Sequence, residues 1–499
     1  MYESFEVTAN ENESGEVLKN GKDYGAADCK MDTKQNANLV YSVDDAVNKV
    51  GYGKFQLKLT LLAGLGWLAD AFEIFILSII GDFMACDWTL FRWQIALLTS
   101  IVFAGIMVGS PVLGAVADVY GRKRSLAVSS ILLFLFGAVS AASPSFIWMV
   151  IFRSCMGFSL GGIAQGVTLN SEYCPTNVRG RAGFFICYFW SLGSLGVVLL
   201  MWLVMEFIGS WRILLLFASV PCLIVIMSLK WYPESARFYL VSDQRERAVK
   251  ILEIMATTNY EELPPGELTK VGLDFKRGRL QDLLGKEYRK TSLLFWYIWF
   301  ATAFSYFGIC LLSPLIVQKG SLMTDYENGT FMQSMTDPVP CATFTRQNYI
   351  DMLWTSAAEF PGLIVFTFLV EHVRRKLLLS SACVASSLSI MLLLLKTHKA
   401  IILSFLFAAR AILCAIFQLN YIMTSEAYPT TIRAVGMGTG TAFCRLGGLI
   451  VPYVAQVLVI EQPVVAICLL GGLVLMASVA AAFLPFETKG IELKESHSG

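Results

Sequence analysis

The chain contains twelve apolar segments that are each long enough to cross a membrane as a helix. A helix needs about 20 residues to span a hydrocarbon core about 30 Å thick. Of the 499 residues, 56% are hydrophobic and only 15% are charged, whereas a soluble domain carries about 25% charged residues. We therefore predict an all-α polytopic membrane protein. The twelve transmembrane helices are expected at about 57–84, 94–118, 125–142, 146–170, 183–206, 212–231, 292–316, 350–371, 377–395, 400–425, 437–458 and 464–484.

Polar segments separate these helices and define the expected domain organisation. The N-terminal segment has no apolar core, so it is predicted to be a disordered tail and not a signal peptide. The charged segment in the middle of the chain must lie in water, and helical spacing predicts short helices at 245–255 and 282–290. The predicted parts are a cytosolic tail (1–50), an N-terminal six-helix half (51–232), a cytosolic linker (233–290), a C-terminal six-helix half (291–485) containing a polar loop (318–348), and a cytosolic tail (486–499).

Composition excludes several classes of function. A net charge of +1 gives no basic surface for nucleic acid. The three histidines and the absence of Cys-x-x-Cys spacing offer no metal site. No nucleophile, base and orienting group can be assembled for catalysis. We therefore expect no cofactor, no metal and no enzymatic activity.

Cations in the loops predict the orientation in the membrane, because Lys and Arg accumulate on the cytosolic side. Arg122, Lys123 and Arg124 lie on the same side as the linker, so both termini are expected in the cytosol. The loop 318–348 is then outside the cell or in a vesicle lumen. The thiols of Cys86 and Cys341 would lie on this oxidising side, where a disulfide between them is one of two open alternatives.

Charged clusters of the first half recur in the second half, at offsets of 253 or 254 residues. Three recurrences in the same order indicate two six-helix halves that pack around a central cavity, an arrangement found in secondary transporters. In each half a Glu followed by Pro ends a helix, and the Arg four residues after the Pro is expected to reach back to that Glu. We predict that these cytosolic residues gate the cavity. The residues that correspond between the two halves are Asp118 and Glu371, Arg122 and Arg375, Glu172 and Glu426, Arg179 and Arg433, and Glu234 and Glu487.

The loop Gly114-Ala-Val-Ala-Asp118-Val-Tyr-Gly121-Arg122-Lys123 resembles the signature between helices 2 and 3 of the major facilitator superfamily. The order of the charged clusters along the chain resembles its sugar-porter and organic-ion-transporter branch. Two departures matter. Arg374 stands where the second signature loop should have Gly, and helix 7 lacks the paired glutamines that bind hexoses in sugar porters. The second departure argues against a sugar as the substrate.

Ionisable residues inside a transmembrane helix are costly and indicate function. Asp70 lies about 20 Å from the cytosolic end of helix 1 at 1.5 Å per residue. Arg153 lies about 10 Å from the opposite end of helix 4, so the two reach the same depth. The resemblance links these two helix positions to proton coupling. We therefore predict an Asp70–Arg153 proton switch with Glu73 as a second proton site. A static ion pair is the alternative.

The second half contributes further intramembrane charges. Glu359 and Arg410 lie at similar depth, so they either pair or contact the substrate. Arg445 lies near mid-membrane in helix 11. In the branch that the chain resembles, a basic residue there implies an anionic substrate such as nicotinate. Aromatic side chains could wall the substrate site or simply pack; those considered are Trp67, Trp190, Tyr306 and Trp354.

Two functions of different class follow. The first is a secondary active transporter of a small organic ion, leaning to a carboxylate-bearing anion, that works by alternating access with proton coupling. The second is a non-transporting vesicle-membrane protein that acts through binding partners on its tail or luminal loop. Retained intramembrane charges favour the first. We expect a monomer in the bilayer of synaptic or secretory vesicles, with the plasma membrane as the alternative.

The loop 318–348 contains Asn328-Gly-Thr, an acceptor triplet for N-glycosylation. We predict that Asn328 is glycosylated in a glycosylating host, so that glycosidase treatment increases the mobility of the protein on a gel. Asn328→Gln should abolish this shift. Because the triplet at Asn12 lies on the predicted cytosolic side, Asn12→Gln serves as the control and should leave the shift intact. A shift that survives Asn328→Gln and is lost in Asn12→Gln would invert the topology.

Overall fold

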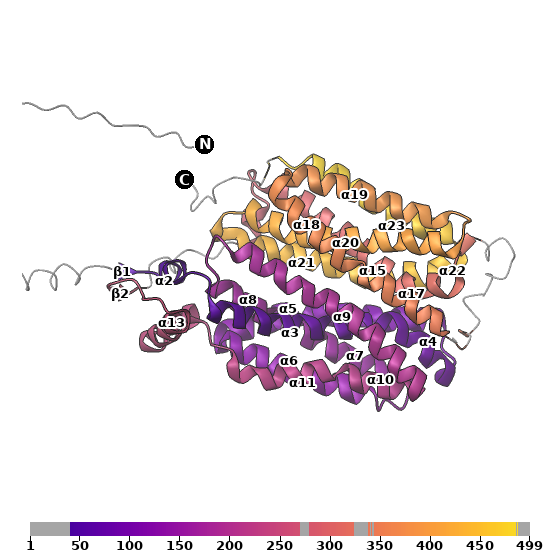
Figure 1. Cartoon of the computed structure of the whole chain (residues 1–499), viewed down its shortest axis with the longest axis horizontal. Helices are drawn as coiled ribbons and strands as arrows, with labels where there is room; N and C mark the ends of the chain where they lie inside the picture. The colour runs from indigo at the N-terminus through magenta and orange to yellow at the C-terminus, as the bar shows by residue number, and fades with distance from the viewer. Residues whose placement is uncertain are drawn as a thin grey trace, which may run out of the picture.

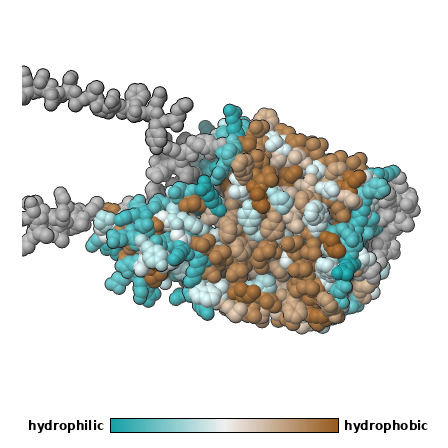
Figure 2. Space-filling model, in the orientation of Figure 1, coloured by the Kyte–Doolittle hydropathy of each residue, from teal (hydrophilic) through white to brown (hydrophobic). Residues whose placement is uncertain are grey.

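The computed structural model describes residues 40–269, 279–323, 338–339, 341, 344–485 and 487. These residues include twelve helices or helix pairs that are long and apolar enough to cross a membrane. The predicted fold class is confirmed. Figure 1 shows the first six spans, in indigo to magenta, lying beside the last six, in orange to yellow. Figure 2 shows a brown apolar belt around the helices with teal polar surface at both ends, as a bilayer requires.

The first half contains six spans, and several of them consist of two helices that meet at a bend. Span 1 bends at Ile76 and span 4 bends after Leu160. The spans are α3 (Lys54–Phe75) with α4 (Leu77–Trp88), α5 (Arg92–Tyr120), α6 (Arg122–Ser140), α7 (Phe146–Leu160) with α8 (Ala164–Tyr173), α9 (Arg179–Phe207), and α10 (Trp211–Ala218) with α11 (Val220–Ser228) and η2 (Leu229–Trp231).

The second half repeats this arrangement. Its span 8 bends at Ala358, directly before Glu359, and its span 11 contains a π-helix, η4, between two α-helices. The spans are α15 (Arg289–Lys319), α17 (Arg346–Ala357) with α18 (Glu359–His372), α19 (Arg375–Met391) with η3 (Leu392–Leu394), α20 (Lys399–Ala427), α21 (Thr430–Pro452) with η4 (Tyr453–Leu458) and α22 (Val459–Glu461), and α23 (Pro463–Ala482).

Glycines allow the helices of each half to approach closely. A Cβ atom on Gly157 of α7 would lie 2.3 Å from the carbonyl oxygen of Val102 in α5. In the second half a Cβ atom on Gly362 of α18 would lie 2.3 Å from the carbonyl oxygen of Ala411 in α20. Small residues at such crossings replace the hydrophobic effect, which lipid does not provide, with backbone packing.

A small module projects from one end of the helices, which we call the linker end (Figure 1). It combines the segment before span 1 with the segment between the halves. Its parallel strand pair is β1 with β2, in which Val40 is opposite Glu267. The elements are β1 (Val40–Tyr41), α2 (Val43–Val50), α12 (Ala236–Val241), α13 (Arg245–Asn259) and β2 (Glu267–Leu268). The short helix α14 (Leu280–Leu283) instead packs against α21 of the second half.

The prediction of a disordered tail over 1–50 is wrong for residues 40–50. Ser42 caps α2, and Asp45 accepts a hydrogen bond from the Ser42 backbone in return. The apolar residues Val43, Val47 and Val50 then share one buried face at helical spacing. A segment of only eight residues with two acidic side chains gave too weak a periodic signal. The short helix expected at 245–255 is present as α13. Of the helix expected at 282–290, only the beginning is helical, because α14 ends at Leu283.

The opposite end, which we call the disulfide end, contains a bond between Cys86 and Cys341. The disulfide alternative is therefore the correct one. It joins the end of α4 in the first half to the segment before α17 in the second. Val339 reinforces the connection by donating a backbone hydrogen bond to Leu90, at 2.8 Å. Asn328 lies outside the described residues.

We predict that Val47→Asp detaches α2 from α13, because Val47 is buried and burial of such a side chain contributes ~1.5–3 kcal/mol. Hydrogen exchange of the α2 amides should accelerate at least ~10-fold while the transmembrane helices keep their protection. Glu246→Ala, at an exposed position of α13, is the control and should change nothing. Unchanged exchange of α2 in Val47→Asp would show that this segment is not held by its apolar face.

Candidate functional site

The predicted gating residues of the first half meet at the linker end. Gly121 has φ +103°, a conformation that favours glycine, and it turns the chain from α5 into α6. Glu234 then accepts backbone hydrogen bonds from Arg122 and Lys123, at 2.8 and 3.1 Å. The guanidinium of Arg122 lies 2.7 Å from the carboxylate of Glu172 and 3.9 Å from that of Asp118. One carboxylate thus caps the helix, and another holds the first cation of the signature.

The second half repeats these contacts. Glu487 accepts backbone hydrogen bonds from Arg375 and Lys376, at 2.9 and 3.4 Å, and Arg375 forms an ion pair with Glu426. Arg374 is extended, with φ −61° and ψ 127°, where its counterpart Gly121 has a positive φ. The departure from the signature therefore changes the turn but not the cap.

Two predicted contacts of the gate are wrong. Arg179 does not pair with Glu172; its Nη2 donates to the carbonyl oxygen of Cys174, at 3.2 Å. In the second half Arg433 likewise donates to the carbonyl oxygen of Tyr428, at 3.3 Å. These arginines satisfy carbonyl groups at helix C-termini. Proximity in sequence did not reveal that the signature arginines already occupy both carboxylates.

Charges also meet between the two halves at the linker end. Glu371 lies 3.2 Å from Arg181 of the first half, whereas its counterpart Asp118 lies 3.9 Å from Arg122 of its own half. Arg179 and Arg433, one from each half, are close enough to repel each other electrostatically. Asp44 of α2 lies 3.9 Å from Arg179 and adds a countercharge. The linker end therefore combines attraction and repulsion across the interface.

The predicted Asp70–Arg153 pair is wrong, because Arg153 pairs with Glu73 instead. Its Nη1 donates to the Glu73 carboxylate at 3.0 Å, and both side chains are buried. The depth calculation was sound, but it did not specify direction around the helix. Three residues turn an α-helix by about 300°, so Asp70 and Glu73 diverge by about 60°. Glu73 points into the first half, where Gly137 and Ser219 surround its Oε1.

Asp70 is close enough to the second half to interact with one of its cations. It is only 3% exposed, and its Oδ1 has no hydrogen-bond partner among the described residues. The cation that attracts it is Arg445 of α21, in the other half. Arg445 itself donates to no described side chain or carbonyl group. An acid of the first half and a cation of the second half thus attract each other electrostatically, and no hydrogen bond joins them.

Glu359 and Arg410 form the second buried pair, at 2.7 Å. Pairing is therefore the alternative that the structure supports. The carboxylate of Glu359 also accepts hydrogen bonds from Tyr306 and from Ser194, each at 3.2 Å. Trp190 donates to the Tyr306 hydroxyl at 2.8 Å. Because Trp190 and Ser194 belong to α9, this network connects the two halves near the bend at Ala358.

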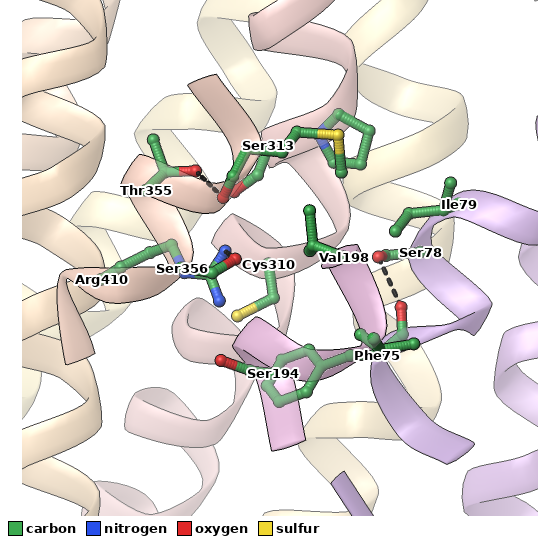
Figure 3. A pocket seen from close by; sticks show the side chains of 13 residues that line it. Phe75, Ser78, Ile79, Ser194, Val198, Cys310, Ser313, Thr355, Ser356 and Arg410 are labelled. Carbon is green, nitrogen blue, oxygen red and sulfur yellow. Dashed lines mark hydrogen bonds between the residues drawn. The ribbon is translucent and has the colours of Figure 1, made fainter. Parts of the chain in front are cut away.

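A cavity adjoins this network. Figure 3 shows Phe75 and Ser194 of the first half facing Ser356 and Arg410 of the second half around it. The cavity has room for about one water molecule. It is therefore too small for an organic ligand in this conformation. Contacts between the halves extend from it toward the disulfide end, where Ser100 donates to the carbonyl oxygen of Leu449.

Three of the four predicted aromatic residues lie near the buried charges. Trp67 lies one turn before Asp70, and its ring centre is 6.0 Å from that of Trp190. Tyr306 belongs to the Glu359 network. Trp354 does not line the centre, because it is 58% exposed and stacks on Phe407 at 4.9 Å. Helical periodicity would have predicted this outward position, since Trp354 lies about 200° around the helix from the inward-facing Ser356.

Sequence reasoning missed two hydroxyl groups of this site. Ser194 donates to Glu359, and Ser356 accepts from Arg410 at 3.2 Å. A serine in an apolar helix is common, so these two carried no signal of their own. The available clue was helical spacing, because Ser194 shares a helix face with Trp190 and Ser356 shares one with Glu359. Within the described ranges, no cluster of three His, Cys, Asp or Glu could hold a metal ion.

Comparisons with known proteins agree with this architecture. The model of the family "Sugar (and other) transporter" matches residues 89–498. The synaptic vesicle 2-related protein of Xenopus laevis is 40% identical over 91% of this chain and 83% of its own length. The putative transporter svop-1 of Caenorhabditis elegans is 38% identical, over 93% of this chain and 88% of its own. The organic cation/carnitine transporter 7 of Arabidopsis thaliana is 32% identical, over 93% and 98%.

Solved structures support the fold alone. A partially occluded inward-open structure of the Escherichia coli xylose transporter XylE aligns with a TM-score of 0.66 at 15% identity, over 88% of this chain and all of the other. The chain belongs to the sugar (and other) transporter family of the major facilitator superfamily.

Proposed function

We propose that this protein is a secondary active transporter of a small organic ion that bears a carboxylate, working by alternating access with proton coupling. The observation that carries the proposal is the facing pair of Asp70 and Arg445. Each is held in an apolar helix, on a different half. A buried charge without a hydrogen-bonded partner is costly, so a ligand that completes its contacts is stabilised there. A carboxylate fits Arg445, because a guanidinium donates to it bidentately.

The two buried acids of span 1 then have different roles. Glu73 and Arg153 belong to the same half, so a rocking motion of the halves leaves their ion pair intact. Asp70 faces the other half, so its surroundings change when the halves move. A proton site must change its environment between the two states of a carrier. We therefore assign proton coupling to Asp70 and a structural role to Glu73 and Arg153.

The orientation follows from the charges at the two ends. The linker end carries the clusters at Arg122–Arg124 and Arg374–Lys376, which favour the cytosolic side. The disulfide end then faces the lumen or the exterior, where thiols oxidise. Because contacts between the halves gather toward the disulfide end, the described conformation corresponds to a carrier closed on that side. The pair of Arg181 and Glu371 would strengthen when the linker end closes.

A non-transporting role in vesicle membranes is the second candidate, since relatives carry the name synaptic vesicle 2-related protein. The names "putative transporter" and "organic cation/carnitine transporter 7" among other relatives support transport instead. The buried charges between the halves support it as well, because a scaffold gains no stability from them. We take localisation in synaptic or secretory vesicles, and action as a monomer, as part of the same proposal.

We predict that Arg445→Ala weakens binding of nicotinate about 10- to 100-fold, because hydrogen bonds to a charged group contribute ~1.5–3 kcal/mol. Binding to the purified protein would be measured by calorimetry, together with uptake into proteoliposomes. Arg374→Ala removes an exposed arginine at the linker end and is the matched control. Arg445→Asp should favour organic cations over anions. Wild-type affinity for the same carboxylate in both Arg445 variants would contradict the assignment.

We predict opposite phenotypes for the two acids of span 1. Asp70→Asn should exchange substrate across the membrane but lose accumulation driven by a pH gradient, and its thermal stability should stay near that of the wild type. Glu73→Gln leaves Arg153 buried without its carboxylate, which costs about 3–5 kcal/mol, so its melting temperature should fall. Normal accumulation by Asp70→Asn would move the proton site to Glu73.

A further inference from the structure

A second cavity lies at the disulfide end, separate from the site between Asp70 and Arg445. Both halves line it: Ser78 and Asp82 of α4 and Arg92 of α5 come from the first, and Pro314 of α15 and Gln456 of η4 come from the second. It has room for about one or two water molecules in this closed conformation. Its polar residues have no role in the contacts described above.

Arg92 is held in this cavity with part of its guanidinium unused. Its Nη1 donates to the Asp82 carboxylate at 3.2 Å, and each side chain is about one-fifth exposed. Its Nε is buried and has no hydrogen-bond partner among the described residues. Because Asp82 occupies only Nη1, the edge formed by Nε and Nη2 donates to no acceptor among the described residues. That edge has the planar, two-donor geometry that matches a carboxylate.

Gln456 supplies an unpaired group from the opposite half. Its Oε1 is buried and accepts no hydrogen bond from any described residue. The residue lies in the π-helix η4, which follows Pro452 and interrupts span 11. π-Helices widen a helix locally and often occur at functional sites. A donor edge on one half and an acceptor on the other thus border one cavity, and neither has a hydrogen-bond partner in the described part of the chain.

The two cavities adjoin, because Ser78 and Pro314 line both. Span 1 connects them to the central charges. Its Phe75 ring lies 5.8 Å from the Arg410 guanidinium, and Asp82 pairs with Arg92. Asp70 and Asp82 are twelve residues apart, which corresponds to about 18 Å along the helix axis. Arginines 445, 410 and 92 therefore follow one another along span 1 from the centre toward the disulfide end.

We propose that Arg92, oriented by Asp82, is a second carboxylate-binding site at the disulfide end, which the ligand occupies before or after the central site. The inference rests on the proposed function, since it takes the same ligand class. Asp82 fixes the direction of the guanidinium and offsets its charge. The ligand is therefore recognised by the direction of the hydrogen bonds, and its affinity stays low enough for release. Gln456 approaches the ligand only when the halves close, and it then accepts a hydrogen bond from the ligand or a water molecule.

The test is the sidedness of the affinity for nicotinate. In proteoliposomes sorted for one orientation by a C-terminal affinity tag, Arg92→Gln should raise KM about tenfold for nicotinate supplied at the disulfide end. KM for nicotinate supplied at the linker end should not change. Arg346→Gln is the matched control, because it removes an arginine from the same end that stacks on Trp202, at 5.7 Å. An unchanged KM at the disulfide end, or an equal rise at both ends, would overturn the inference.

Two further variants keep the test decisive. If Arg92→Gln is unstable because Asp82 loses its partner, Arg92→Gln combined with Asp82→Asn removes both charges and should give the same one-sided rise in KM. Gln456→Leu should also raise KM, at the disulfide end only. If the wild type moves no carboxylate, both the proposed function and this inference fail. If the wild type does move it while all three variants keep wild-type KM values, only this inference fails.

Discussion

The free-energy cost of placing a charge in an apolar transmembrane helix determines how the buried charges of this protein are paired. Arg153 and Glu73 offset this cost by forming an ion pair inside the first half, at 3.0 Å. Arg410 and Glu359 meet it largely inside the second half, at 2.7 Å, with hydroxyl groups of both halves completing the carboxylate's contacts. Asp70 and Arg445 instead interact electrostatically between the halves, and the buried Oδ1 of Asp70 has no hydrogen-bond partner among the described residues. Pairs within a half stabilise a rigid body, whereas a pair between halves depends on their relative position.

The repeat explains why the halves can move as rigid bodies. Glu234 and Glu487 cap equivalent helices, and Arg122 and Arg375 hold equivalent carboxylates. These contacts lie within each half and at the linker end. The contacts that join the halves are of other kinds. They include the Cys86–Cys341 disulfide, the hydrogen bonds from Ser194 to Glu359 and from Ser100 to the Leu449 carbonyl oxygen, and the ion pair of Arg181 with Glu371 at the linker end. Rocking therefore exchanges non-covalent contacts between the halves, while the disulfide stays in place.

The sequence predicted what depends on hydrophobic length and on repeated charge, and it failed where direction or local packing decides. The twelve spans, the two halves and the family are confirmed, as is the disulfide between Cys86 and Cys341. Depth in the membrane could be counted from the number of residues, so Arg153 was correctly predicted to pair with an acid of span 1. Which acid it pairs with depended on the angle around the helix. The contacts of Arg179 and Arg433 depended on competition for carboxylates. The pairing of Arg92 with Asp82 was not predicted either, because it depends on the direction in which each side chain leaves its helix.

The most direct test of the account is a crystal structure with bound 5-bromonicotinate, in which the anomalous signal of bromine locates the ring. We predict a peak between span 1 and span 11, with the carboxylate within about 3 Å of the Arg445 guanidinium and the ring beside Trp67 and Trp190. In that complex the Glu73–Arg153 pair should be unchanged. A direct ion pair between Asp70 and Arg445 with the bromine elsewhere would contradict the account.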